Sequence, residues 1–207
     1  MTILFRRLSK FIFDQPVFYK NLRILFLGGL PTTPVLKLLE PQSDDVIIDV
    51  GCGDGFISKK ISCKQYIGID NDPAVIEVAN RNKNRNSLFI REDIRSINLD
   101  VLHPTKAILY GVLHHLSNLD AIDVLNALSK AVSHSIITLD PIYSRYHAIN
   151  NFLCGLDRGR FVRTEKAMHE LLDQTNLRIE TQLIHYANTK IAKYISLRLI
   201  PPKRIRE

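Results

Sequence analysis

Apolar and polar residues alternate along the chain in blocks that predict strands and helices in turn. Five short runs rich in β-branched residues are typical of strands buried on both faces of a sheet, and a closing pair of strands follows them. The five runs are 46–50, 66–70, 87–91, 107–110 and 135–139, and the closing pair is 177–187 and 191–199. Strands that alternate with helices predict an α/β fold, a doubly wound and mostly parallel seven-stranded sheet with helices on both faces.

Helical patterns fill the spaces between these runs. The clearest one is 119–131, where apolar residues recur on one face. Further helices are expected at 57–61, at 73–80 behind an Asp72-Pro73 cap, and at 165–174.

Residues 1–43 predict helices rather than strands. The last of these helices is expected to open with Thr33 as N-cap and Pro34 at the first helical position, and to end at Glu40. We therefore expect an N-terminal helical lid over residues 1–43 and a ligand-binding domain over residues 44–207.

A glycine-rich turn, Gly51-Cys52-Gly53-Asp54-Gly55, follows the first strand directly. Ligands of parallel sheets bind beyond the carboxyl ends of the strands, and glycines let the backbone approach them closely. The turn lacks the third glycine of a dinucleotide fingerprint, because Phe56 stands there, and no P-loop lysine follows. A tight turn without a ligand would look similar, but Asp49 at the strand end favours a ligand, since a buried carboxylate needs a partner.

Carboxylates follow the next two strands at the same edge of the sheet. Asp70 ends the second strand, where it can accept hydrogen bonds from both hydroxyls of a ribose. Asp93 follows the third strand and can accept a hydrogen bond from an adenine amino group. The position of Asp93 fits the N-cap of a short helical turn equally well.

Four segments together form a recognisable set of motifs. They are 46–58 (VIIDVGCGDGFIS), 66–74 (YIGIDNDPA), 89–94 (FIREDI) and 110–116 (YGVLHHL). They resemble the motifs of class I S-adenosylmethionine-dependent methyltransferases, and the fourth is similar to small-molecule members of the ubiquinone/menaquinone type. Residues 156–164 (LDRGRFVRT) also resemble a late segment of envelope-associated bacterial members. The resemblance covers about residues 44–190.

The resemblance implies a Rossmann-like methyltransferase fold and S-adenosyl-L-methionine as cofactor. The residues that it places around the cofactor are Asp49, Gly51, Cys52, Gly53, Asp70, Asn71, Asp93, Ile94 and Tyr110. The chain departs from the family pattern twice. Thr105-Lys106 replaces the acidic residue common before strand four, which removes one minor contact, and 131–134 (AVSH) replaces the usual Pro-Gly-Gly before strand five.

Two histidines and a basic loop are candidates for the acceptor chemistry. His114 and His115 follow the fourth strand, and each can act as a general base or simply pack in a turn. Residues 143–163 are expected to roof the acceptor pocket, because clustered arginines suit a phosphate or carboxylate, although a solvated basic loop would have the same composition. The candidate acceptor contacts are Tyr143, Arg158 and Arg160, with Arg145 and Arg163 in the same cluster.

The net charge of +7 is concentrated at the two ends, with +4 in residues 1–25 and +5 in residues 190–207. Such ends suit a nucleic-acid enzyme or a contact with an anionic membrane. The Asn-Pro-Pro-aromatic signature of amino-methylating nucleic-acid enzymes is absent, and no RNA-binding module is visible. We therefore expect no nucleic-acid partner. Peripheral membrane contact is expected through an apolar and basic helix within residues 1–12 and through apolar and basic positions of 195–206.

The chain has three cysteines and no C-x-x-C pair, which predicts neither a disulfide scaffold nor a metal site. The odd cysteine count favours a location in the cytoplasm, and any membrane contact is expected at the inner face of the membrane. The sequence thus predicts methyl transfer from S-adenosyl-L-methionine to a small-molecule or lipid-linked acceptor. An RNA methyltransferase and a non-catalytic, cofactor-binding regulatory protein remain alternatives. The oligomeric state is not predicted.

Overall fold

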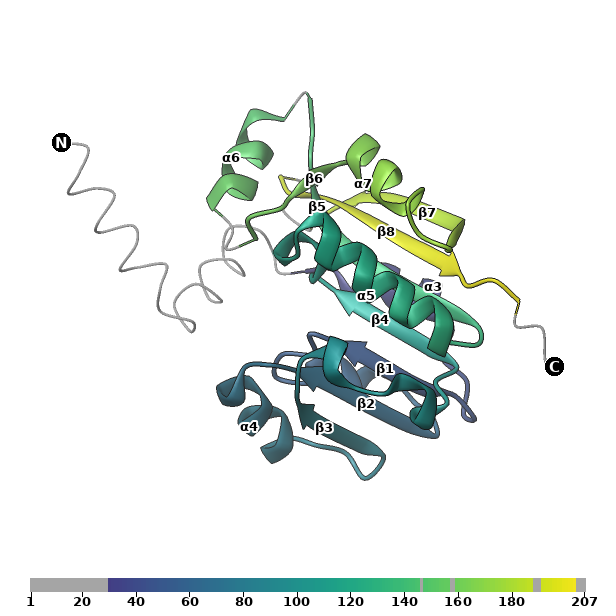
Figure 1. The fold of residues 1–207 in the computed structure, drawn as a ribbon. Coiled ribbons are helices and arrows are strands. Elements are labelled where there is room, and N and C mark those ends of the chain that lie inside the picture. Colours follow the sequence, from purple (N-terminus) through teal and green to yellow (C-terminus); the bar gives the residue numbers. More distant parts are fainter. Residues whose placement is uncertain (1–29, 146, 157–158, 188–190, 204–207) are drawn as a thin grey trace.

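The computed structural model describes residues 30–145, 147–156, 159–187 and 191–203, which form one sheet with helices on both of its faces (Figure 1). The strand order is β3-β2-β1-β4-β5-β8-β7, and the two-residue β6 pairs with β5 outside this path. The strands are β1 Val46–Val50, β2 Gln65–Asp70, β3 Ser87–Arg91, β4 Lys106–Tyr110, β5 Ser135–Tyr143, β6 Arg163–Thr164, β7 Arg178–Tyr186 and β8 Lys193–Ile200. Strands β1 to β5 pair in parallel, and β8 runs antiparallel to both of its neighbours. The predicted doubly wound, mostly parallel sheet is therefore confirmed.

The helices lie between the strands in sequence. They are α3 Thr32–Leu39, α4 Pro73–Arg81, α5 Asn118–Ala131, α6 Ala148–Leu156 and α7 Glu165–Leu172, with single 3-10 turns at η1 Phe56–Lys60, η2 Ile94–Ser96, η3 Leu99–Leu102 and η4 Leu113–His115. Asp72 caps α4 as predicted, since its side chain accepts the backbone N–H of Ala74 at 2.8 Å.

Two apolar cores cover the two faces of the sheet. Successive residues of a strand point to opposite faces, so Ile48 of β1 packs in one core, with α5 and α7, and Ile47 packs in the other, with α3, η1 and α4. Both isoleucines are completely buried. Strands covered on both sides need continuous apolar sequence, which explains why these runs were visible in the sequence.

Helix α3 corrects one sequence prediction. It begins at Thr32, with Pro31 at the N-cap position and no side-chain cap, so the predicted Thr33 cap is wrong. Its residues Val35 and Leu39 are buried in the core beneath the sheet. The rest of the predicted N-terminal lid, residues 1–29, lies outside the described residues.

Two other segments differ from the sequence prediction. The helix predicted at 57–61 is the 3-10 turn η1, Phe56–Lys60, and not an α-helix; Gly55, at φ 71°, stands at its N-cap. Helix α6 was not predicted at all.

The predicted membrane contact of the C-terminal segment is wrong for the residues that the structure describes. Ile195, Leu197 and Leu199 lie in β8, between β5 and β7, and none of them is exposed. The strand alternates apolar with polar residues, and this pattern resembled an amphipathic surface segment. Arg198 lies on the α3 side of the sheet, where it donates to the carbonyl oxygen of Leu38 at 3.0 Å and forms ion pairs with Glu40 and Glu180, both at 2.8 Å.

Thr105 and Lys106 stand where related sequences carry an acidic residue before β4. Their side chains contact the buried carboxylate of Asp45. The hydroxyl of Thr105 donates to Oδ1 of Asp45 at 2.6 Å, and Nζ of Lys106 lies 2.8 Å from Oδ2. Both charged side chains are almost fully buried, and their pairing satisfies the charges.

Candidate nucleoside-binding site

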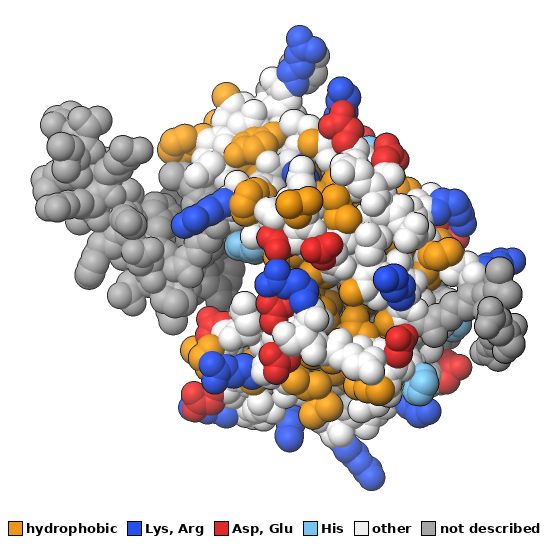
Figure 2. Space-filling model, in the orientation of Figure 1, with side chains coloured by type: hydrophobic (Ala, Val, Ile, Leu, Met, Phe, Trp, Pro, Cys, Tyr) orange, Lys and Arg blue, Asp and Glu red, His pale blue; other side chains and the backbone are white. Residues whose placement is uncertain are grey.

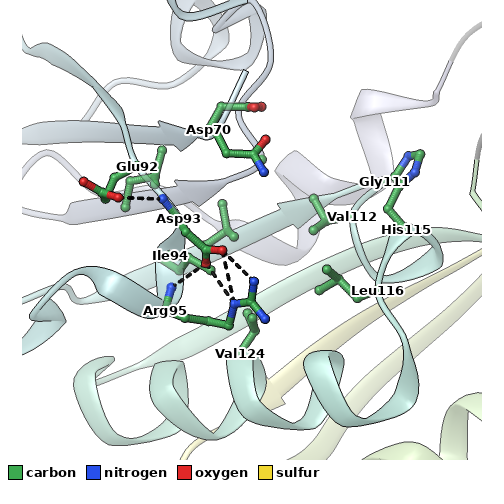
Figure 3. Close-up of a pocket in the computed structure, with 14 residues that line it drawn as sticks. Asp70, Glu92, Asp93, Ile94, Arg95, Gly111, Val112, His115, Leu116 and Val124 are labelled. Atoms are coloured by element: carbon green, nitrogen blue, oxygen red, sulfur yellow. Dashed lines mark hydrogen bonds and ion pairs between the residues drawn. The ribbon is translucent and has the colours of Figure 1, made fainter. Parts of the chain in front are cut away.

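A pocket of about 340 Å³ lies at the carboxyl ends of β1 to β4, where the strand order reverses between β1 and β4 (Figure 3). Its lining residues are Val50, Gly51, Ile69, Asp70, Asn71, Glu92, Asp93, Ile94, Arg95, Gly111, Val112, His115, Leu116 and Val124. Pockets of this size and place in open α/β sheets hold nucleotide-like ligands. The structure thus brings together Gly51, Asp70, Asn71, Asp93 and Ile94, five of the predicted cofactor residues.

All three glycines of the turn after β1 have a positive φ, and at Gly51 and Gly55 a side chain would also collide with a neighbour. Gly51 has a φ of 67°, and a Cβ atom there would lie 2.8 Å from Cγ2 of Val112. Gly55 has a φ of 71°, and a Cβ atom there would lie 2.5 Å from the ring of Phe89. Any side chain would therefore strain the turn and, at position 51, narrow the pocket.

Asp70 is held in place by two backbone N–H groups. Its Oδ2 atom accepts the N–H of Gly53, and its Oδ1 atom accepts the N–H of Asp72, both at 3.0 Å. A carboxylate oxygen can accept two hydrogen bonds, so each oxygen retains the capacity for one more. Asp70 lines the pocket, and a pair of adjacent hydroxyl groups fits this arrangement (Figure 3).

Asp93 forms hydrogen bonds and an ion pair with Arg95, and this partner was not predicted from the sequence. The Oδ1 atom of Asp93 accepts the backbone N–H of Arg95 at 2.9 Å, so the N-cap interpretation is correct, and its Oδ2 atom accepts Nη2 at 2.6 Å. The other guanidinium arm reaches Asp120 of α5 at 2.8 Å. Hydrogen bonds from Arg95 lower the pKa of Asp93 to about 2, and the carboxylate thus remains an ionised acceptor at the pocket wall.

Four predicted cofactor residues lie outside the pocket lining: Asp49, Cys52, Gly53 and Tyr110. The side chain of Asp49 is buried beneath the glycine turn, where it accepts a hydrogen bond from the hydroxyl of Tyr66. Burial raises the pKa of Asp49 to about 7, and the nearby charge of Asp70 adds to this effect, while the bond from Tyr66 opposes it.

The remaining three of these residues shape the turn and the rim of the pocket. Burial, reinforced by the charges of Asp49 and Asp70, raises the pKa of the Cys52 thiol, which therefore stays protonated. Gly53 acts through its N–H, which orients Asp70. Tyr110 donates its hydroxyl proton to the carbonyl oxygen of Leu30 and thereby ties the start of the described chain to the end of β4.

The two predicted histidines lie in different surroundings. His115 is exposed and lines the pocket, whereas His114 is 1% exposed. The Nδ1 atom of His114 lies 2.8 Å from Oδ1 of Asp140, and the two histidine rings are 4.1 Å apart. Burial raises the pKa of Asp140, and its interactions with His114 and Arg163 oppose this shift.

The prediction that Arg163 belongs to the basic loop over the acceptor pocket is wrong. Arg163 is buried, and its guanidinium donates to the carbonyl oxygens of Leu113 and Leu116, at 2.6 and 2.8 Å, and to the side chain of Asn118. These bonds fix the turn that carries both histidines. The sequence alone does not distinguish an arginine that donates to backbone carbonyl oxygens from one that binds a ligand.

The other predicted acceptor residues lie outside the lining of the pocket. Tyr143 is half-buried at the end of β5, Arg160 is exposed, and Arg158 lies outside the described residues.

The known proteins that this chain resembles in sequence are methyltransferases. Residues 47–135 match the family model of a methyltransferase domain. The chain is 32% identical to the ribosomal protein L11 methyltransferase of Colwellia psychrerythraea in an alignment of 136 residues that covers 58% of this chain and 45% of that protein. It is 37% identical to the enzyme of the same name from Thermosipho africanus over 57 residues, or 26% of this chain and 21% of that protein. The chain thus spans less than half the length of these two relatives.

Solved structures of methyltransferases share the fold over most of the chain. Magnesium protoporphyrin IX methyltransferase from Synechocystis, solved with bound S-adenosylhomocysteine, superposes with a TM-score of 0.67 at 15% identity, over 95% of this chain and 100% of that one. Geranyl diphosphate C-methyltransferase from Streptomyces coelicolor superposes with a TM-score of 0.68 at 11% identity, over 91% of this chain and 87% of that one.

Proposed function

We propose, from the match of residues 47–135 to a methyltransferase domain, that the chain is a class I methyltransferase and transfers a methyl group from S-adenosyl-L-methionine to a small-molecule or lipid-linked acceptor. Asp70 is the observation that carries the proposal. Two backbone N–H groups orient its carboxylate at the pocket, beside the glycine turn, and each oxygen keeps room for one more hydrogen bond.

The pocket residues divide into a sugar-binding and a base-binding group. Asp70 would accept the two ribose hydroxyls, and Gly51 leaves the backbone open beside them. Arg95 donates two hydrogen bonds to each oxygen of Asp93, so the adenine amino group would bind Asp93 in place of the longest of them, which joins Nε of Arg95 to Oδ2 at 3.2 Å. Ile94 and Val124 supply apolar surface to the same end of the pocket.

The methyl group of S-adenosylmethionine is already activated, so alignment of the acceptor is the main requirement of the site. When the acceptor must lose a proton, we assign the role of general base to His115, because its side chain is exposed and lines the pocket. We assign a positioning role to His114, which is buried against Asp140 and carries His115 as its neighbour in the chain.

The acceptor class is the finer part of the proposal. Ribosomal protein L11 is the acceptor named for the sequence relatives, but the match leaves more than half of those proteins uncovered. Two structural relatives are named for magnesium protoporphyrin IX and geranyl diphosphate, which are small molecules rather than proteins. Tyr143 and Arg160, together with Arg158, remain our candidates for holding an anionic acceptor group.

We further propose that the protein works in the cytoplasm, in contact with the inner face of the membrane. Residues 1–12, which the sequence assigns to this contact, lie outside the described residues. None of the described helices is long and apolar enough to cross a membrane.

Methyl transfer itself is tested with S-adenosylmethionine that carries a tritiated methyl group, incubated with the protein and, in separate reactions, a total lipid extract, an aqueous metabolite extract or a total RNA extract. We expect label to enter one extract with the wild-type protein and not with Asp70→Ala. Label removed by ribonuclease would favour the RNA alternative. Absence of transfer to any extract, despite binding of the cofactor, would favour the regulatory alternative.

A further inference from the structure

Helix α6 turns Asn150 towards the protein and exposes two large apolar side chains, Ile149 and Phe152, to solvent. Asn150 is 1% exposed, its amide donates to the carbonyl oxygen of Ile142 at 2.9 Å, and its Oδ1 atom accepts the N–H of Lys193 at 2.8 Å. Asn151 exchanges two bonds of 2.8 Å with the backbone of Ser144. The helix is therefore fastened to β5 and β8 by hydrogen bonds.

The opposite side of α6 is apolar and open. Ile149 is 65% exposed and Phe152 is 66% exposed, and a spacing of three residues puts them on one face of the helix. A Cβ atom at Gly155 would meet nothing within 4 Å. Figure 2 shows hydrophobic side chains at the surface where Figure 1 places α6. This reverses the usual polarity of a surface helix and indicates that the face meets an apolar partner.

The charges around α6 indicate the nature of that partner. Arg145 precedes the helix and Arg160 follows it, and both are exposed. Between residues 143 and 162 the sequence holds three arginines and a single acid. An apolar helix face flanked by arginines is typical of helices that lie in the headgroup region of an anionic bilayer.

The position of α6 connects this face to the pocket. The helix follows β5 at the carboxyl edge of the sheet, and the chain after it returns to the histidine turn, where the N–H of Phe161 donates to the carbonyl oxygen of His114 at 3.0 Å. His115, the next residue, lines the pocket. A bilayer in contact with α6 would therefore lie near the carboxyl edge of the sheet, which is also the edge that carries the pocket.

We propose that the outward face of α6, formed by Ile149 and Phe152 with Arg145 and Arg160 beside it, docks on an anionic lipid bilayer. The purpose of this contact, delivery of a lipid-linked acceptor, rests on the proposed function, but the docking does not depend on methyl transfer and is measured without it.

The test measures binding of the full-length protein to vesicles of phosphatidylcholine with and without phosphatidylglycerol at low salt. We expect binding only to the anionic vesicles. The double variant Ile149→Gln, Phe152→Gln should lower the partition coefficient by at least about tenfold. Arg145→Gln and Arg160→Gln should each lower it by about fivefold. The matched control is Val101→Gln, since Val101 is an equally exposed apolar residue just before β4, at the opposite edge of the sheet.

A second measurement reports the contact directly. The three native cysteines are buried, so the variant Phe152→Cys can be labelled selectively with an environment-sensitive fluorophore. We expect its emission to shift to the blue when anionic vesicles are added.

Two results would overturn the proposal. One is binding of the double variant as tight as that of the wild type. The other is a fluorophore at position 152 that is already shielded without vesicles and unchanged by them, which would mean that another part of this chain covers the α6 face. Vesicle binding without methyl transfer would instead refute the proposed function and leave the docking surface in place.

Discussion

The carboxylate of Asp140 holds His114 at two points, because its Oδ1 atom accepts the backbone N–H of His114 at 3.0 Å and lies 2.8 Å from Nδ1 of the ring. Both side chains are buried, and His115, next in the chain, lines the pocket. Asp140 of β5 therefore fixes the turn that supplies the proposed base.

Removing the ring of His114 should destabilise the protein. His114→Ala leaves the buried carboxylate of Asp140 without its side-chain partner, which typically costs about 3 kcal/mol. Urea unfolding measures the loss. His115→Ala is the matched control and should change stability by less than about 0.5 kcal/mol, because that side chain is exposed. Equal stability of the two variants would contradict the positioning role of His114.

Removing the ring of His115 should affect transfer rather than binding. If the acceptor loses a proton, His115→Ala should lower turnover by about a hundredfold or more, with nearly unchanged affinity for S-adenosylhomocysteine. Transfer of tritiated methyl groups to the accepting extract, combined with calorimetry, separates the two quantities. Unchanged turnover would mean that alignment alone drives the transfer.

Asp93 should make the pocket selective for an amino group on the purine. The wild type should bind S-adenosylhomocysteine about tenfold more tightly than S-inosylhomocysteine, in which a carbonyl replaces that amino group. Asp93→Asn should reduce this preference, since the amide can donate to the carbonyl. Competition binding with both ligands measures the ratio. A wild type that binds both equally would remove Asp93 from the base-binding group.

The buried Asp49 should make stability depend on pH. Below pH 3.8 the carboxyl group of Asp49 is protonated in both the folded and the unfolded chain, so its ionisation does not change the free energy of unfolding. As the pH rises towards about 7 the unfolded chain ionises first, so folding stability is lost over this window, by about 4 kcal/mol in total. Asn resembles the protonated carboxyl group. Asp49→Asn should therefore gain stability relative to the wild type between pH 4 and pH 8 in urea unfolding. If the free energies of unfolding of Asp49→Asn and the wild type differed by the same amount at every pH, Asp49 would have an ordinary pKa in the folded protein.

The strands and the pocket edge were predictable from sequence because they follow from local rules. Strands covered on both faces need unbroken apolar runs, such as 107–110, and ligands lie where such runs end. Asp70 and the glycine turn were found in this way.

Features that depend on long-range contacts were not predictable. Helix α6 carries its asparagines inward, and only their bonds to Ile142, Ser144 and Lys193 explain that orientation. Arg163 has the composition of a ligand-binding arginine but binds carbonyl oxygens about fifty residues away. Arg95 stands two residues after Asp93, yet its partner Asp120 is 25 residues further along the chain.

The most direct test of the central claim, that the pocket after β1 and β2 binds S-adenosylmethionine through Asp70, is titration calorimetry of the full-length protein with S-adenosylhomocysteine and with NAD. The account predicts binding of S-adenosylhomocysteine, no binding of NAD, and a loss of affinity of at least about tenfold in Asp70→Ala, which leaves the ribose hydroxyls unpaired. Asp44→Ala, at an exposed carboxylate just before β1 on the opposite edge of the sheet, should bind like the wild type. Binding of NAD alone, or equal affinity of the wild type and Asp70→Ala, would contradict it.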